Sequence, residues 1–174
     1  MVALYNLLES IRGFIELGGN VLWAILVVLL AMWTMILERY WYLLRVFPNE
    51  RRAVIREWEG RSDRRSWHAR RIRDGLISDA RQKLRKNVGM IQTLVSICPL
   101  LGLLGTVTGM VAVFDVMAFF GTANARAMAA GVSKATVPTM AGMVAALSGV
   151  YFASHLDRKA ALETEKIKDF LSSQ

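Results

Sequence analysis

Three of the threonines in stretches without Asp, Glu, Lys or Arg are candidates for chemistry. Thr106 and Thr108 lie in the stretch 87–114, and Thr139 lies in the stretch 135–156. A threonine hydroxyl both donates and accepts a hydrogen bond without carrying a charge, so it can relay a proton. The same hydroxyl often bonds back to its own helix, which gives it a purely structural role. The sequence leaves both roles open.

One acid and one base flank these threonines. Asp115 follows Thr106 by nine residues, which is about 13.5 Å along a helix, and Lys134 precedes Thr139 by five residues. A charge at membrane depth is a functional candidate, because an unpaired charge there is costly. Asp115 and Lys134 therefore belong to a proton pathway, form an ion pair with each other, or are solvated at the membrane surface.

Small residues recur on one face of each of these two stretches. The first face holds Gly102, Gly105 and Gly109, and the second holds Ala135, Thr139, Gly142 and Ala146. Small side chains let two helices approach closely in a membrane. The two stretches thus either pack simply against each other or line a narrow, partly hydrated path. Pro99 and Pro138 each lack a backbone N–H donor, which predicts a kink near each proline.

The charged residues leave three uncharged stretches, 17–37, 87–114 and 135–156. Because about 20 helical residues cross the hydrocarbon core of a bilayer, each stretch can span a membrane. The chain has 174 residues, 54% of them hydrophobic, and its mean hydropathy is +0.34. One Cys and two His exclude a disulfide scaffold and a zinc module. The sequence predicts an all-α membrane protein with three transmembrane helices and cytoplasmic helical extensions.

Lys and Arg set the expected orientation in the membrane. Residues 39–86 hold 15 of the 22 basic residues, and the positive-inside rule places such a loop in the cytoplasm. The N-terminus then lies outside and the C-terminus inside. The loop also explains the sequence pI of about 10.1, so no nucleic-acid partner is expected, whereas contact with anionic lipids is.

Local signals predict two helices within the basic loop. Residues 48–50 predict a helix start with Asn49 as N-cap, and residues 62–63 predict the start of the next helix. Apolar residues then recur mostly at i+4 as far as Ile91, which predicts a helix running unbroken into the second span. The loop holds no phosphate-binding motif, Ser/His/Asp set or carboxylate pair. No catalytic residue, metal or cofactor is expected, and the chain is not expected to be an enzyme.

Two motifs of this chain resemble those of the ExbB/TolQ/MotA family of proton-channel proteins. Residues 99–109 have the sequence Pro-Leu-Leu-Gly-Leu-Leu-Gly-Thr-Val-Thr-Gly, and residues 131–146 have the sequence Gly-Val-Ser-Lys-Ala-Thr-Val-Pro-Thr-Met-Ala-Gly-Met-Val-Ala-Ala. The three spans and the cytoplasmic loop between the first two are similar as well. Within the family the chain looks most like ExbB, and in particular like its short second type.

The resemblance implies an assembly and a function. Family members form a pentameric pore in the bacterial inner membrane, and this homo-oligomer encloses transmembrane helices of an ExbD-like partner whose aspartate exchanges protons. A TonB-like protein carries the resulting work to outer-membrane receptors, so the chain is expected to be a proton-driven energiser of outer-membrane import. The pore threonines of the family map onto Thr106 and Thr139.

One departure from the family pattern opens alternatives. The family commonly has Glu where this chain has Lys134, and many members lack the acid found here at Asp115. One interpretation is that the two positions have exchanged charge and pair with each other. Another is that the chain no longer conducts protons and is a structural scaffold for partner helices. A TolQ-like subunit for envelope maintenance is a further alternative.

The expected organisation combines the spans, the charges and the resemblance. A periplasmic or interfacial N-terminal helix covers 1–16, transmembrane helices cover 17–38, 87–120 and 134–156, the basic cytoplasmic helical loop covers 39–86, a periplasmic hairpin covers 121–133, and a cytoplasmic tail covers 157–174.

Overall fold

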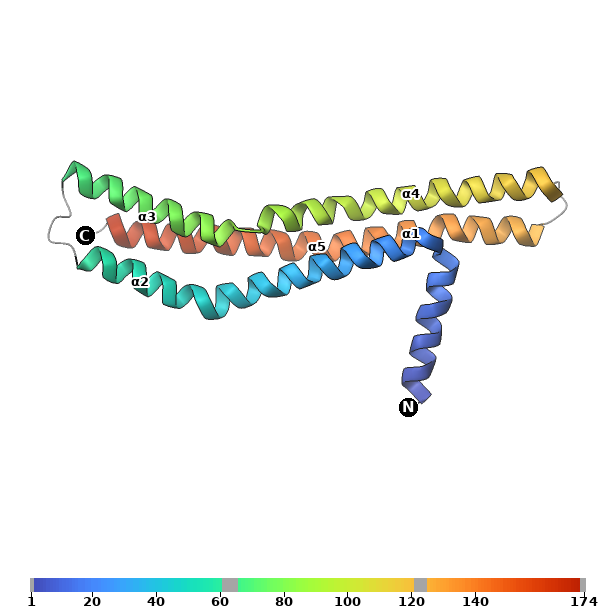
Figure 1. Ribbon diagram of the computed structural model, residues 1–174, viewed down its shortest axis with the longest axis horizontal. Helices are drawn as coiled ribbons and strands as arrows, with labels where there is room; N and C mark the ends of the chain where they lie inside the picture. Colours follow the sequence, from blue (N-terminus) through green and yellow to red (C-terminus); the bar gives the residue numbers. More distant parts are fainter. Residues whose placement is uncertain (1, 61–65, 121–124, 173–174) are drawn as a thin grey trace. The chain divides into compact units, whose positions relative to one another are not determined.

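The computed structural model describes residues 2–60, 66–120 and 125–172, and these are almost entirely helical. The elements are α1 (Val2–Trp41), the π-helical turn η1 (Tyr42–Val46), α2 (Phe47–Glu59), α3 (Trp67–Arg85), α4 (Val88–Phe120) and α5 (Ala125–Ser172), as Figure 1 shows. No strand occurs in the described ranges. The prediction of an all-α chain is confirmed.

Three helical stretches are long and apolar enough to cross a membrane: Gly18–Glu59, Trp67–Phe119 and Met128–Ser172. Most of their large apolar side chains are exposed within the chain, Val27, Leu103, Phe114, Val144 and Leu147 among them. Apolar surface of this extent suits contact with lipid or with other membrane helices. The three-span prediction agrees with this finding.

The chain divides into two compact units. The first, called here the apolar unit, consists of residues 1–32 and 93–149, and the second, called the charged unit, consists of residues 33–92 and 150–174. The two units differ in composition, because all 15 basic residues of the segment 39–86 belong to the second unit. The second unit also buries the large side chains of Trp58 and Leu84, whereas the helix contacts of the first involve several glycines.

In the apolar unit, α4 packs against α5, and α1 joins them after a sharp change of direction. Gly19 has φ 66° and ψ −164° inside α1, a conformation that glycine adopts readily and other residues rarely do. The N-terminal part of α1 therefore ends at Gly19, three residues beyond the predicted boundary at 16. Close contacts pair Gly142 with Cys98, Gly109 with Ala135 and Gly131 with Val113. Along these contacts the residue number rises on α4 while it falls on α5, so the two helices are antiparallel.

In the charged unit, η1 and α2 continue from α1, and α3 and the C-terminal part of α5 pack beside them (Figure 1). Ser66 caps α3, since its hydroxyl accepts a hydrogen bond from the Ala69 amide at 3.1 Å. The core consists of large side chains that are almost fully buried: Phe47, Trp58, Leu84, Leu156, Ile167 and Leu171. Burial of this apolar surface holds the unit together.

Two local predictions about the basic loop are wrong. Asn49 is not an N-cap, because α2 begins at Phe47 and follows η1 without leaving helical geometry, so few free amides remain to be capped. The helix before the second span is not unbroken, because α3 ends at Arg85 and α4 begins at Val88. The predicted start at residues 62–63 lies outside the described residues.

The outer and C-terminal ends of the last helix extend further than the predicted span. Helix α5 has already begun at Ala125, inside the predicted hairpin 121–133, and continues to Ser172. The alternating charges of the tail predict this continuation. Both α4 and α5 remain helical through Pro99 and Pro138.

Candidate functional site

The candidate site is the contact between α4 and α5 in the apolar unit, where two backbones meet directly. A Cβ atom added to Gly102 would lie 3.0 Å from Cα of Thr139, and one added to Gly142 would lie 2.5 Å from the carbonyl oxygen of Cys98. Real side chains do not tolerate such distances to a backbone. The glycines are therefore required for the approach of the two helices.

The remaining glycines of the predicted packing face meet α5 as well. Gly105 faces the ring of Pro138, and a Cβ added to Gly109 would lie 2.5 Å from Cα of Ala135. All of Gly102, Gly105, Gly109 and Gly142 are buried. Pro138 thus fills the space above Gly105, a packing role that the sequence did not indicate.

Thr139 joins the two helices by a hydrogen bond. Its Oγ1 donates to the carbonyl oxygen of Gly102 at 3.0 Å and lies 3.4 Å from the carbonyl oxygen of Ala135 in its own helix. The residue is half-buried. Its hydroxyl therefore sits within the close contact of the two backbones, and its bond crosses from one helix to the other.

Thr106 and Thr108 bond only within α4. Oγ1 of Thr106 donates to the carbonyl oxygen of Leu103 at 2.7 Å, and Oγ1 of Thr108 lies 3.1 Å from the carbonyl oxygens of both Leu104 and Gly105. Thr106 is half-buried and Thr108 is exposed. Both hydroxyls make the local bond that is common for threonine in helices.

These bonds define what the two half-buried hydroxyls can do. Each of Thr106 and Thr139 uses its one proton on a backbone carbonyl, and each keeps oxygen lone pairs that can accept another hydrogen bond. A protonated carboxylic acid could donate to them without further change. A carboxylate can only accept a hydrogen bond, so the hydroxyl would first have to break its bond to the backbone carbonyl before it could donate to the carboxylate. The site can therefore distinguish the two protonation states of an acid.

The flanking charges lie apart within one chain. Asp115 on α4 and Lys134 on α5 are both exposed, and no ion pair joins these two described residues. The register that sets Gly109 against Ala135 brings Lys134 level with Met110. Lys134 is thus offset from Asp115 by five residues, about 7.5 Å along the helix. Asp115 and Lys134 therefore do not pair within a single chain. A pair between neighbouring chains stays a prediction.

Two further glycines belong to the contact and were missed from the sequence. Gly131 faces Val113, and Gly149 faces Met32 and Val95. Gly142 and Gly149 are seven residues apart, a spacing that returns to the same helix face. This spacing could have extended the predicted small face toward the C-terminal part of α5.

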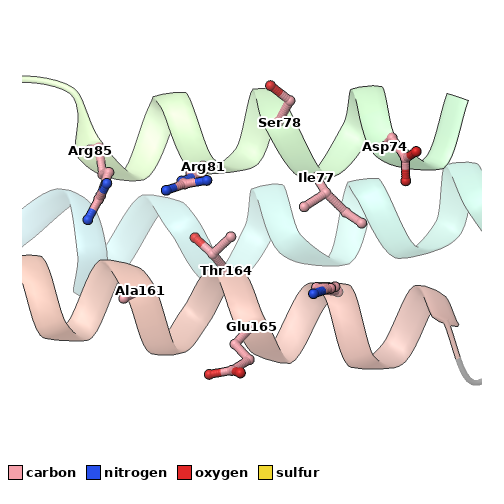
Figure 2. A pocket seen from close by; sticks show the side chains of 9 residues that line it. Asp74, Ile77, Ser78, Arg81, Arg85, Ala161, Thr164 and Glu165 are labelled. Carbon is pink, nitrogen blue, oxygen red and sulfur yellow. The ribbon is translucent and has the colours of Figure 1, made fainter. Parts of the chain in front are cut away.

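A groove in the charged unit lies between α3 and the C-terminal part of α5 (Figure 2). Its volume is about 500 Å³, and it is lined by residues of both charges: Asp74, Ile77, Ser78, Arg81, Arg85, Ala161, Thr164, Glu165 and Lys168. Arg81 and Arg85 reach from α3 toward Thr164 and Ala161 on α5 in Figure 2. Nη2 of Arg85 also pairs with Oδ1 of Asp157 at 3.2 Å. The groove suits charged groups rather than an apolar ligand.

The part of the chain that the structure describes contains no group of His, Cys, Asp or Glu side chains arranged to hold a metal ion. The polar groups at the contact of α4 and α5 are threonine hydroxyls and backbone carbonyls. Such groups can guide a proton but cannot bind one permanently at neutral pH.

The chain is similar to known membrane proteins. The sequence model of the MotA/TolQ/ExbB proton channel family matches residues 49–169. This range includes the second and third predicted spans and both motifs.

Three curated relatives illustrate the similarity. The protein named ExbB-like 3 of Synechocystis sp. (strain ATCC 27184 / PCC 6803 / Kazusa) is 40% identical over 67 residues, which cover 37% of this chain and 32% of that protein. ExbB-like 1 of the same organism is 37% identical over 68 residues, which cover 37% and 27%. The biopolymer transport protein ExbB of Pseudomonas putida is 29% identical over 117 residues, which cover 67% and 34%.

The matched part amounts to about a third of the length of these relatives. No solved structure matches the chain.

Proposed function

Because the chain belongs to the MotA/TolQ/ExbB proton channel family, we propose that it is an energiser subunit driven by the proton-motive force. The complex would be of the ExbB–ExbD–TonB type and would power import across the outer membrane. The three apolar helices and the family together make the chain a multi-pass inner-membrane protein. In the proposed orientation the N-terminus is periplasmic and the C-terminus cytoplasmic.

The observation that carries this proposal is the hydrogen bond from Thr139 to Gly102. The bond places a hydroxyl within the glycine contact of α4 and α5 and leaves its lone pairs able to accept. An acid on a partner helix would bond to Thr139 differently in its protonated and ionised states. Proton uptake and release by that acid would then change how α4 and α5 are joined.

The proposed assembly is a pentamer around transmembrane helices of an ExbD-like partner, with a TonB-like protein as the receiver of the work. The exposed apolar residues of α4, which include Leu100, Leu104, Val107, Met110 and Phe114, form one broad face of the helix. Such a face suits contact with lipid or with another membrane helix.

Anionic lipids are the proposed partners of the basic surface. Asp157 directly follows the third uncharged stretch, and Arg85 lies two residues before the second, so their ion pair marks the proposed cytoplasmic boundary of the spans. Arg81 is one helical turn farther out. Juxtamembrane basic side chains of this kind are attracted to the negative inner leaflet.

A second candidate function is a non-conducting scaffold for partner helices, or a TolQ-like subunit within the same family. Lys134 favours the scaffold, because a cation cannot replace a carboxylate beside a proton path. The scaffold requires the glycine contact but makes no use of a proton relay through the threonine hydroxyls.

Substitution of the hydroxyls separates the two functions. Thr106→Val and Thr139→Val keep the branched shape and remove the proton donor and acceptor. The energiser predicts that each variant assembles normally but fails to support growth on a TonB-dependent iron source, and that Thr139→Ser retains growth. Thr108→Val is the matched control, because Thr108 is exposed and bonds only to its own helix. Normal growth of the Thr106→Val, Thr139→Val double variant would favour the scaffold.

A further inference from the structure

Two of the places where regular α-helix geometry changes in the charged unit lie close to Arg39. The chain passes through the π-helical turn η1 between α1 and α2, and through Lys86 and Asn87 between α3 and α4. Asn87 has φ 64°, a left-handed conformation that Asn tolerates better than most residues. The first bond of α4 then runs from the Ile91 amide to the Asn87 carbonyl at 3.0 Å. The break leaves the last carbonyls of α3 without amide donors from a following turn.

Arg39 of α1 supplies a donor to this end of α3. Its Nη1 donates to the carbonyl oxygen of Lys83 at 3.3 Å, although the two residues are 44 positions apart in the sequence. Arg39 is 3% exposed, which makes it the one polar or charged residue among the buried side chains of the described chain. A cation at the C-terminal end of a helix also interacts favourably with the helix dipole.

A second chain of contacts ties Arg39 to η1 and α2. Its guanidinium carbon lies 5.1 Å from the centroid of the Tyr42 ring, and Oη of Tyr42 donates to Oε2 of Glu50 at 2.8 Å. Burial and this bond to Glu50 raise the pKa of Tyr42 to about 12, so the phenol remains a donor at neutral pH. One side chain thus contacts α3 and the turn that leads into α2.

The buried position of the Arg39 guanidinium is costly, because a guanidinium keeps its charge and cannot be neutralised by losing a proton. No carboxylate among the described residues pairs with Arg39, and its Nε has no hydrogen-bond partner. The compensation comes from the carbonyl and dipole of α3 and from the face of Tyr42. An apolar side chain would fill the space at less cost. The charge is therefore explained by what it does to the end of α3.

We propose that Arg39 is the positioning residue of a joint between α3 and α4. Its guanidinium holds the C-terminal end of α3 against α1. The left-handed conformation of Asn87 interrupts the helix, so the direction of α4 is independent of the direction of α3. The cytoplasmic helix then stays in place while the membrane helix that follows it changes position. This use of the joint rests on the proposed energiser function, whereas the capping of α3 by Arg39 does not.

Hydrogen exchange in the full complex, reconstituted in lipid nanodiscs, tests the capping directly. In Arg39→Met, we expect the amides of residues 82–92 to exchange about ten- to a hundredfold faster, since a hydrogen bond to a charged group is lost. Exchange in α2 and in α5 should stay unchanged. Arg45→Met is the matched control, because Arg45 is an exposed arginine of η1, and it should leave all rates as they are. Arg39→Lys retains the charge without the planar stack and should lie between the two.

The substitution Asn87→Ala distinguishes the capping of α3 by Arg39 from the function of the joint between α3 and α4. Alanine disfavours the left-handed conformation and favours one continuous helix, in which the carbonyls of residues 83–85 find amide partners without Arg39. In the Arg39→Met, Asn87→Ala double variant we therefore expect slow exchange at residues 82–92 to return. Growth on a TonB-dependent iron source should nevertheless be lost in this double variant, because the joint itself is gone.

Three results would overturn the proposal. One is unchanged exchange at residues 82–92 in Arg39→Met, and another is an equal rise across all helices, which would make Arg39 a general stabilising residue. The third is full growth of the double variant, which would show that no joint is needed. If Arg39→Met does not accumulate, Arg39→Lys is measured in its place against the same outcomes. Normal growth of the threonine double variant would refute the proposed function and leave the exchange result standing.

Discussion

The two units of the chain hold their helices together in opposite ways. In the apolar unit, α4 and α5 meet through glycines, and a single Cβ atom has no room at Gly142. In the charged unit, large side chains such as Trp58 and Leu84 fill the space between helices. The first kind of contact is destroyed by adding atoms and the second by removing them. The unit in which a substitution is made thus decides whether added or removed side-chain atoms lower the stability.

The largest effect is expected from deletion in the charged unit. Trp58 is 1% exposed, and replacing a buried Trp by Ala costs about 3–5 kcal/mol. We expect Trp58→Ala to lower the thermal midpoint of the purified chain strongly or to prevent its accumulation. Trp58→Phe is the matched control, because it retains most of the ring and removes an indole N–H that has no partner. A mild effect of Trp58→Ala would mean that this unit tolerates cavities.

The next effect is expected from insertion in the apolar unit. Gly142→Ala adds one methyl group that would lie 2.5 Å from a backbone oxygen of α4, and overpacking of this kind costs about 1–3 kcal/mol. The helices must separate, so the bond between Thr139 and Gly102 should weaken as well. Thermal unfolding in detergent measures the loss.

A glycine of the charged unit provides the control for that experiment. A Cβ atom added to Gly75 would meet nothing within 4 Å. Gly75→Ala should stabilise α3 by about 0.5–1 kcal/mol, because alanine restricts the unfolded chain more than glycine. Equal destabilisation by both substitutions would remove the contrast between the two units.

A smaller effect is expected from the ion pair between Arg85 and Asp157. Their side chains are 47% and 36% exposed, and pairs at such exposure contribute about 0.2–1 kcal/mol. Arg85→Met and Asp157→Asn should each lower the stability by this amount at low salt and by less at 0.5 M salt, since added ions screen the pair. A loss that is independent of salt would indicate a packing role for the Arg85 stem instead.

The smallest effect on the folded chain is expected at Asp115 and Lys134. Both are exposed and unpaired with each other, so Asp115→Asn and Lys134→Met should each change unfolding by less than about 0.5 kcal/mol. Native mass spectrometry of the assembly is the more sensitive measurement. If the two charges pair between neighbouring chains, each single variant should weaken the oligomer, and exchanging the two residues should restore it. Intact oligomers in both single variants would leave two solvated charges.

The sequence was sufficient to predict the elements that follow from periodicity and composition. Uncharged stretches of about 20 residues predicted three spans, and the spacing of Gly102, Gly105 and Gly109 predicted a face for close contact. The partner of each glycine did not follow, because the packing of Pro138 on Gly105 depends on the antiparallel register. Register is a property of two helices together, and one helix pattern does not contain it.

The break at Asn87 could not be predicted from local signals. Apolar residues continue through it at helical spacing, and neither Lys86 nor Asn87 forbids a helix. What stabilises the break is Arg39, which is far away in the sequence. From the sequence Arg39 is merely the first base of a basic loop. A buried function for such a residue becomes visible only once the fold is known.

The glycine contact also bears on how the chain enters the membrane during synthesis. The third span, within α5, has the lowest hydropathy of the three, because it is rich in Gly, Ala and Thr. A helix of this composition partitions poorly into lipid by itself. Helix α4 precedes it in the chain and offers a matching surface, where Gly102 and Gly142 allow the backbones to touch. The two helices are thus suited to leave the translocation machinery as a preformed hairpin, in which α4 shields the part of α5 that lipid would otherwise have to accommodate.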